Sequence, residues 1–173
     1  MTFTPIRTTR LVIRPLRPSD AEALATYRSR PEVARYQSWE TYSIAQARDL
    51  IGLMEHSTPE VKGDWYQFGV ALTETGQLIG DIGVLNTDAE GRSWIGFTLD
   101  PLFWKRGLAS EAVTAILRYY AELGIATIWA STDPLNVASR QLLERLSFSL
   151  VEMTSSDATY QLPLETVTSR ASG

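Results

Sequence analysis

The chain has 173 residues, of which 44% are hydrophobic and 21% charged, with no cysteine and a single histidine. This composition is typical of one folded domain with a substantial core, and it excludes a disulfide framework, a thiolate nucleophile and a cysteine or zinc-cluster metal site. A net charge of −4 argues against nucleic acid and for a cationic small-molecule or peptide partner.

The sequence begins without the basic and apolar segments of a signal peptide, and no run is long and apolar enough to span a bilayer. We therefore expect a cytoplasmic protein that binds neither membrane nor nucleic acid. No internal repeat or linker is present. We predict a single domain over residues 1–173, with its core over about 8–165 and a flexible tail over about 166–173.

The N-terminal part predicts a strand over residues 10–16, followed by two helices. Each helix begins with a capping-box pattern, in which a serine is followed three residues later by Glu or Gln. These pairs are Ser19 with Glu22 and Ser43 with Gln46.

The segment between these helices, residues 35–40, joins aromatic rings to a carboxylate without clean periodicity. Its rings, Tyr36 and Trp39, would expose apolar surface unless they pack or bind something. One interpretation is a loop that folds back to cap the core. The other is a binding surface for a substrate, and both remain open here.

Three strand-like runs rich in Phe, Val, Ile and Trp predict an antiparallel meander that leads into a long amphipathic helix. A further strand, a helix and a hairpin complete an α/β arrangement with mixed strand directions. The meander covers residues 65–72, 78–85 and 93–99; the long helix 108–123, closed by Gly124; the next strand 125–131; and the hairpin 150–152 and 158–164.

The residues just before the long helix predict an anion site. The N–H groups of a first helical turn have no intrahelical acceptor, and Gly107 allows close approach to the backbone. Lys105 and Arg106 add positive charge, which suits a phosphate or pyrophosphate. The alternative is that Gly107 only eases a tight turn and that the two cations are solvated.

Two nucleotide motifs do not fit the chain. Residues 106–109 lack the second glycine, lysine and hydroxyl residue of a P-loop. Residues 80–83 contain two glycines, but they lie within a strand-like run and do not open a helix as the Rossmann fingerprint does.

The segment that leads into the long helix resembles the pyrophosphate-binding motif of the GNAT acetyltransferases, Gln/Arg-x-x-Gly-x-Gly/Ala, often followed by Thr-Glu-Ala. Trp104 takes the first place of that pattern, as in the ribosomal-protein N-acetyltransferase branch. The matching residues are Trp104, Lys105, Arg106, Gly107, Leu108, Ala109, Ser110, Glu111 and Ala112. In the family, the backbone amides of this loop hold the pyrophosphate of acetyl-CoA.

Residues 136–148 resemble the second motif of the same family, Asn-x-x-Ser/Ala followed by a short helix and Leu-Gly-Phe. Asn136 and Ser139 match its start, and Ser147 replaces the usual glycine. The resemblance covers residues 10 to about 160 and implies a mixed, mostly antiparallel sheet flanked by about four helices. In that fold the fourth and fifth strands splay apart and the pantetheine arm pairs with the fourth, here through Phe97, Thr98 and Leu99.

The resemblance also implies the reaction, which is direct attack of a primary amine on the acetyl-CoA thioester without a metal. A backbone N–H of the fourth strand, that of Phe97, is expected to stabilise the oxyanion. Related sequences often have Glu before Ile-Gly-Tyr, but Trp94 stands there in this chain. Asp81 and Glu40 are the candidate bases, and each could instead be a structural or solvated carboxylate.

Leu143 occupies the place where many family members have a tyrosine acid, which leaves Ser139 as the candidate proton donor to the thiolate. Helix packing with a backbone hydrogen bond is the alternative role for Ser139. In the family the loop between the first two helices borders the acceptor pocket, and some aminoglycoside acetyltransferases carry a similar Arg-Tyr-Gln-Ser-Trp.

We therefore expect Tyr36, Trp39 and Glu40 to bind a small cationic amine or a peptide N-terminus. The enzyme is expected to be a monomer or homodimer. A non-catalytic acyl-CoA-binding module, which kept the cofactor loop and lost its acid and base, is the alternative function.

Overall fold

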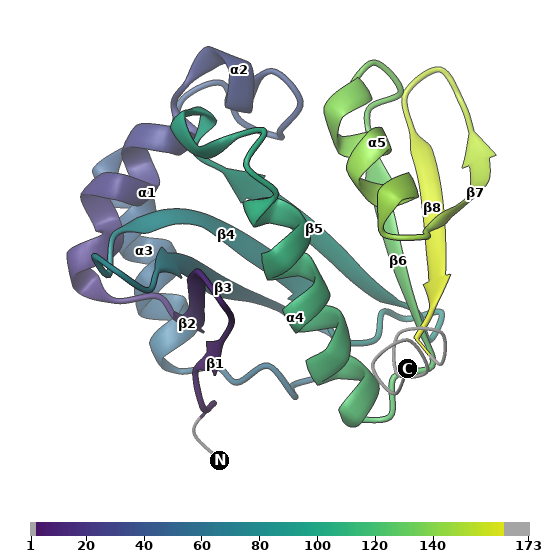
Figure 1. Cartoon of the computed structure of the whole chain (residues 1–173), viewed down its shortest axis with the longest axis horizontal. Coiled ribbons are helices and arrows are strands. Elements are labelled where there is room, and N and C mark those ends of the chain that lie inside the picture. Colours follow the sequence, from purple (N-terminus) through teal and green to yellow (C-terminus); the bar gives the residue numbers. More distant parts are fainter. Residues whose placement is uncertain (1–2, 165–173) are drawn as a thin grey trace.

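The computed structural model describes residues 3–164, and its strands form one eight-stranded sheet in the order β1-β2-β3-β4-β5-β6-β8-β7 (Figure 1). The strands are β1 Ile6–Arg7, β2 Leu11–Pro15, β3 Trp65–Leu72, β4 Leu78–Leu85, β5 Ser93–Leu99, β6 Thr127–Thr132, β7 Ser149–Met153 and β8 Ala158–Pro163. The helices are α1 Ala21–Arg28, α2 Pro31–Ala34, α3 Ile44–Glu55, α4 Leu108–Glu122 and α5 Val137–Arg145, with 3₁₀ turns at Pro18–Asp20 and Pro101–Phe103.

The sheet is mixed and mostly antiparallel, as predicted. Its single parallel pair among the described strands is β5 with β6, which are in register only at Ser93 with Ile128 and Trp94 with Trp129. Beyond these positions the two strands separate, and Figure 1 shows the V-shaped opening between them. The predicted splay between the fourth and fifth strands of the family fold is therefore present here between β5 and β6.

Helices cover both faces of the sheet, and β3 shows which face is which. Phe68 of β3 makes edge contacts with the rings of Tyr119 and Tyr120 on α4. The preceding residue, Gln67, points to the opposite face, where it meets Asp81 beside α1. Helix α4 thus packs on one face and α1 on the other, and Figure 1 shows α4 and α5 in front of the sheet.

Helix α4 begins at Leu108, as the apolar period predicts, and is followed by Gly124 with a φ of +84°. Glu111, in the first turn of α4, makes long-range contacts that the apolar period does not predict. Its carboxylate accepts hydrogen bonds from the Thr8 hydroxyl at 2.6 Å, the Arg10 backbone at 2.8 Å and the Arg10 guanidinium at 2.7 Å. Glu111 therefore ties α4 to the turn between β1 and β2.

Of the two predicted capping boxes, one forms. Ser43 and Gln46 exchange both hydrogen bonds at the start of α3. The Ser19–Glu22 box is wrong, because residues 18–20 form a 3₁₀ turn in which Asp20 accepts from the Arg17 backbone. The buried Asp20 also pairs with Arg14 at 2.7 Å, a tertiary contact that overrides the local pattern.

The structure adds two short elements that the sequence pattern missed, strand β1 and helix α2, so that the described residues contain five α-helices where about four were expected. Ser147, which replaces the family glycine after α5, adopts a φ of +72°. The left-handed turn is thus kept with a side chain in place. Among residues 3–164, no helix is long and apolar enough to cross a membrane, and the predicted tail at 166–173 lies outside the described residues.

The contacts of Glu111 make its charge a source of stability that depends on pH. Burial alone would raise the pKa of Glu111, but the hydrogen bonds from Thr8 and Arg10 outweigh burial and lower it. Because the folded-state pKa is lowered, the stabilisation is complete above the ordinary glutamate pKa of about 4.3 and is lost as the pH falls through the folded value.

We therefore predict that Glu111→Gln lowers the free energy of unfolding by about 1 kcal/mol at pH 7, since Arg10 is half exposed and only part of the pair is desolvated. Urea unfolding at pH 7 and pH 3 should show this difference shrinking at the lower pH. Glu122→Gln, an exposed carboxylate on the same helix, is the matched control. An equal loss in both variants, or one that does not change with pH, would contradict the assignment.

Candidate functional site

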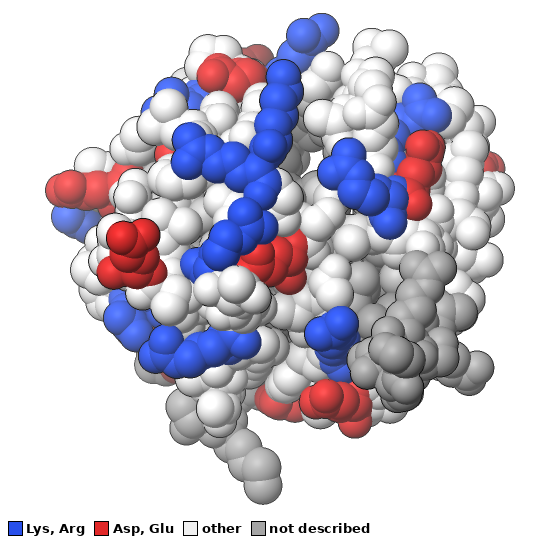
Figure 2. All heavy atoms as spheres, in the orientation of Figure 1, with Lys and Arg blue, Asp and Glu red and all other residues white. Residues whose placement is uncertain are grey.

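A cleft of about 970 Å³ lies where β5 and β6 separate. Its walls come from α2 and the loop after it, from β3, β4 and β5, from the loop before α4, and from β6 and the start of α5. Figure 2 shows the molecule hollowed between the region of α4 and that of α5, with Lys and Arg side chains on both sides. Segments far apart in the sequence are thus brought to one site.

The loop before α4 forms one end of this cleft. Lys105 and Gly107 both adopt left-handed backbone conformations, with φ of +60° and +74°. Arg10, in the turn between β1 and β2, holds this loop in place. It donates to the carbonyl oxygen of Arg106 at 2.8 Å, and its Nε pairs with Glu111 of α4. The first-turn amides of α4 therefore face the cleft on a fixed backbone.

The predicted residues of this loop lie at the cleft, with one exception. Lys105, Gly107, Leu108, Ala109 and Ser110 line it together with Trp104, whereas Arg106 does not and lies over the Phe103 ring. The hydroxyl oxygen of Ser110 is buried and has no hydrogen-bond partner among the described residues. A buried polar atom without a partner beside a helix N-terminus fits a polar ligand at this position.

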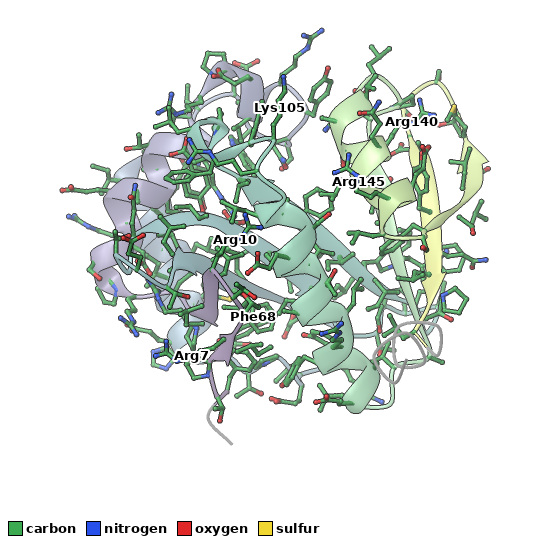
Figure 3. The ribbon with its side chains drawn as sticks, in the orientation of Figure 1. Arg7, Arg10, Phe68, Lys105, Arg140 and Arg145 are labelled. Carbon is green, nitrogen blue, oxygen red and sulfur yellow. The ribbon has the colours of Figure 1, made fainter. Side chains whose placement is uncertain are left out.

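A cation that the sequence reasoning missed faces this loop. Arg145, at the end of α5, lines the cleft, and Figure 3 shows Lys105 on one side of the opening and Arg145 on the other. Because α5 was predicted only as a short helix in a motif, nothing in its spacing indicated which residue would point across the cleft. The two cations favour an anionic guest at this end.

The backbone of β5 forms the next part of the wall. The backbone N–H of Asp100 donates to the carbonyl oxygen of Ile79 on β4. Along an antiparallel ladder, hydrogen-bonded residue pairs alternate with pairs whose backbone groups point away from the partner strand. The backbone groups of Phe97 and Leu99 therefore point away from β4, toward the opening. Those of Thr98 point to β4, so Thr98 lines the cleft with its side chain and the expectation that its backbone faces the opening is corrected.

One of these outward groups is already occupied. The indole N–H of Trp104 donates to the carbonyl oxygen of Leu99 at 2.8 Å. The N–H and C=O of Phe97 and the N–H of Leu99 remain directed at the gap between the strands. This arrangement can accept an extended polar chain as a partial additional strand.

The start of α5 provides the opposite wall. Asn136 caps the helix by accepting from the Ser139 backbone at 3.1 Å, and both residues line the cleft. The Ser139 hydroxyl makes no hydrogen bond to any described residue. The backbone hydrogen bond expected for its alternative, structural role is therefore absent among these residues. Leu143 is 1% exposed and has no group that could donate a proton.

The loop after α2, residues 35–40, forms another part of the cleft wall. Tyr36 and Trp39 both line it, and the Tyr36 hydroxyl donates to the carbonyl oxygen of Leu135 across the opening at 3.3 Å. Trp39 stacks on the Arg28 guanidinium with 4.8 Å from Cζ to the ring centroid and donates to the Arg28 carbonyl at 3.0 Å. Glu40 is exposed and does not line the cleft, so this geometry does not favour its predicted role.

Asp81 reaches the cleft but is fully engaged. It is 1% exposed and accepts hydrogen bonds from the Tyr27 hydroxyl, the Gln67 amide and, at 2.6 Å, Arg28 Nη2. Burial and then the charge of Asp81 raise the pKa of Tyr27. Burial alone would lower the pKa of Arg28, but Asp81 outweighs it and raises it. A carboxylate held this way fits a structural role better than that of a base.

The other carboxylate at the cleft is Glu32 of α2, which the sequence reasoning did not single out. It is exposed at the edge of the cleft, and α2 itself was not predicted. Asp81 and Glu32 are the carboxylates that line the cleft among residues 3–164.

Comparison with known proteins agrees with this geometry. Residues 10–149 match the family model described as an acetyltransferase (GNAT) domain. The chain is 36% identical over 144 residues to the Bacillus licheniformis protein named uncharacterized N-acetyltransferase p20, covering 82% of this chain and 80% of that one. It is 33% identical over 149 residues to the Bacillus subtilis protein named uncharacterized N-acetyltransferase YoaA, covering 84% and 83%.

Among solved structures, the fold resembles that of RimL, a ribosomal L7/L12 alpha-N-protein acetyltransferase in complex with coenzyme A. The TM-score is 0.76 at 17% identity, with 92% of this chain and 98% of that one covered. Since the family model spans most of the sequence and the relatives are similar over four-fifths of it, the chain belongs to the GNAT family and is an N-acetyltransferase.

Proposed function

We propose that this N-acetyltransferase takes its acetyl group from acetyl-CoA and transfers it to the primary amine of a small molecule or a peptide N-terminus. One observation carries the proposal: the amides at the N-terminus of α4 and the outward backbone of β5 line the same cleft. Helix amides suit a pyrophosphate, and an outward strand edge suits an amide-containing arm. The solved structure of RimL is a complex with coenzyme A, a ligand of this chemistry.

The residues at the cleft fit acetyl-CoA. The amides of residues 105–110 and the unpartnered Ser110 hydroxyl would hold the pyrophosphate, with Lys105 and Arg145 supplying charge. Phe97 and Leu99 would hold the amide-containing arm. Acetyl-CoA supplies an acyl group activated as a thioester, so the protein contributes position and electrostatics.

Phe97 and Ser139 take the two charge-stabilising roles in the proposed reaction. The Phe97 N–H, directed at the gap, would donate to the acyl oxygen as negative charge develops there. The Ser139 hydroxyl, free at the start of α5, would donate a proton to the departing sulfur. Asp81 is engaged by Arg28 and Tyr27, so we propose that the amine loses its proton to water.

Tyr36 and Trp39 would contact the acceptor, because they line the cleft on the loop after α2. Their rings can contact the carbon atoms that carry the amine. Glu40 is not part of this proposal, since its side chain does not line the cleft.

The first test is binding of acetyl-CoA, measured as a thermal shift. At a ligand concentration about a hundred times its dissociation constant, the native state should gain roughly 2.7 kcal/mol. Gly107→Glu should abolish this shift, since it places a side chain and a negative charge at the α4 mouth.

Gly76→Glu is the matched control for this variant. Gly76 has a φ of +73°, close to the +74° of Gly107, but it lies in the β3–β4 turn away from the cleft. Both variants should lose stability through backbone strain, and only Gly107→Glu should lose the ligand shift. Equal ligand shifts in the two variants would show that the α4 loop is not the binding site.

Ser139→Ala tests the proton donor. We expect kcat to fall about tenfold or more, because the leaving thiolate loses its proton source, while the acetyl-CoA thermal shift stays within error of the parent. Ser139→Thr, which keeps a hydroxyl at the same place, should recover part of the activity. If Ser139→Ala turns over at the parent rate in single-turnover measurements, Ser139 has a packing role only.

The alternative function is a module that binds acyl-CoA without transferring the acyl group, and it predicts a different result in the same measurements. It would give the thermal shift with acetyl-CoA but no release of free thiol with any amine. Thiol release against a panel of primary amines therefore separates the two functions.

A further inference from the structure

On the face of the sheet opposite α4, a cross-strand row that contains two glycines lies next to the proposed reaction centre. Gln67 of β3 pairs with Gly83 of β4, and Gly83 pairs with Gly96 of β5. All three point to the same face, because cross-strand partners share a side of the sheet. The row runs across three strands and ends at Gly96, one residue before Phe97.

Larger side chains border this row on both sides. On one side of the row, the next residues that face the same way are Trp65, Leu85 and Trp94. On the other side they are Gly69, Asp81 and Thr98. Trp65 is 49% exposed and lines the cleft. We call the channel formed by Gln67, Gly83 and Gly96, with Trp65 and Thr98 at its sides, the glycine groove.

The two glycines differ in the space above them, which is open at Gly96 and filled by neighbouring side chains at Gly83. A Cβ at Gly96 would meet no atom within 4 Å, and its backbone lies outside the left-handed region. Glycine is therefore not required there by backbone conformation or by packing. At Gly83 a Cβ would lie 2.7 Å from the Gln67 side-chain oxygen and 3.2 Å from the Trp65 ring. Gly83 thus leaves the Gln67 oxygen uncovered.

The orientation of the Gln67 amide follows from its partners. Asp81 forms an ion pair with Arg28, and its carboxylate oxygen accepts a hydrogen bond from the Gln67 NH₂ group. The Gln67 carbonyl oxygen is consequently turned over Gly83. Among residues 3–164, no group donates a hydrogen bond to that oxygen, which leaves an acceptor in the groove.

The electrostatic character of the groove is close to neutral. Arg28 and Asp81 cancel each other in a buried pair, and the remaining groove residues carry no charge. A groove of this kind offers an ammonium group no free carboxylate. It therefore suits the neutral amine that attacks a thioester, in agreement with proton loss to water.

We propose that the glycine groove is the acceptor site, and that it selects a primary amine on an unbranched carbon with a hydrogen-bond donor roughly 5 Å beyond the nitrogen, about one strand spacing. This inference rests on the proposed function. The amine lies at Gly96 beside Phe97, the carbon chain runs from Gly96 toward Gly83, and the donor binds the Gln67 oxygen, which lies over Gly83. A branch at the first carbon would meet Thr98 or Trp65.

Three matched amines test this specificity in the parent enzyme. They are 3-aminopropan-1-ol, butylamine, in which a methyl group replaces the hydroxyl, and 3-aminobutan-1-ol, which adds a methyl branch beside the nitrogen. We expect 3-aminopropan-1-ol to have the highest kcat/KM, butylamine to be about fivefold poorer for want of one hydrogen bond, and the branched amine to be poorer still. Equal kcat/KM values for all three would overturn the proposal.

Gln67→Leu tests the acceptor oxygen. Asp81 keeps Arg28 and Tyr27 as donors in this variant. The KM for 3-aminopropan-1-ol should rise about fivefold, to that of butylamine, while the KM for butylamine stays unchanged. A variant whose KM rises equally for both amines would show that Gln67 acts only through the packing around Asp81, and would overturn its role as acceptor.

Gly96→Ala tests the floor of the groove. The added methyl group meets no protein atom, so the acetyl-CoA thermal shift should match that of the parent, whereas KM for the linear amines should rise at least tenfold. Gly52→Ala is the control, since Gly52 also has 4 Å of free space around its Cβ position but lies in α3 outside the cleft. An unchanged KM in Gly96→Ala would place the acceptor elsewhere.

These outcomes separate the inference from the proposed function. If the parent binds acetyl-CoA and releases thiol with amines, but the variants do not discriminate among them, the groove assignment fails and the acetyl transfer stands. If the parent releases no thiol with any amine, the acetyl transfer fails and the groove assignment fails with it.

Discussion

The separation of β5 from β6 is the constraint on which the site depends. The strands pair at two positions only, and the last pair joins Trp94 to Trp129. These rings stack at 5.9 Å between centroids, and the Arg92 guanidinium lies over both at 5.2 and 5.7 Å. Beyond this cluster β5 follows β4 and β6 follows β8, so each half of the sheet keeps its own ladder. The unpaired backbone of Phe97 results directly from this.

Two networks hold elements of the first half in place around the opening. Glu111 and Arg10 join the β1–β2 turn to α4 and fix the carbonyl of Arg106. Arg28 and Asp81 join α1 to β4 inside the sheet face that carries the glycine groove. Buried ion pairs contribute less to net stability than their geometry suggests, because both charges are desolvated. The effect of this ion pair on local conformation is clearer, since Asp81 determines which way the Gln67 amide points.

The proposed reaction uses both faces of the sheet. The N-terminus of α4 lies on the sheet face that α4 covers, while Gln67, Gly83 and Gly96 point to the face that α1 covers. The two meet only where the sheet is open, beside Phe97. A transferase that binds two substrates gains from this arrangement, because each substrate can enter from its own side and the reacting atoms meet in the gap.

The sequence by itself determined the local elements and the family. The strands at 65–72, 78–85 and 93–99, the start of α4 at Leu108 and the Ser43–Gln46 cap follow from residue periodicity and from hydrogen bonds within a few residues. The resemblance at the α4 mouth likewise depends on one continuous segment. Only the tertiary structure decided the role of Glu111, the cleft position of Arg145, the engagement of Asp81 and the exclusion of Glu40 from the cleft. Each of these depends on which partner is brought close across the fold, and spacing along the chain carries no information about such contacts.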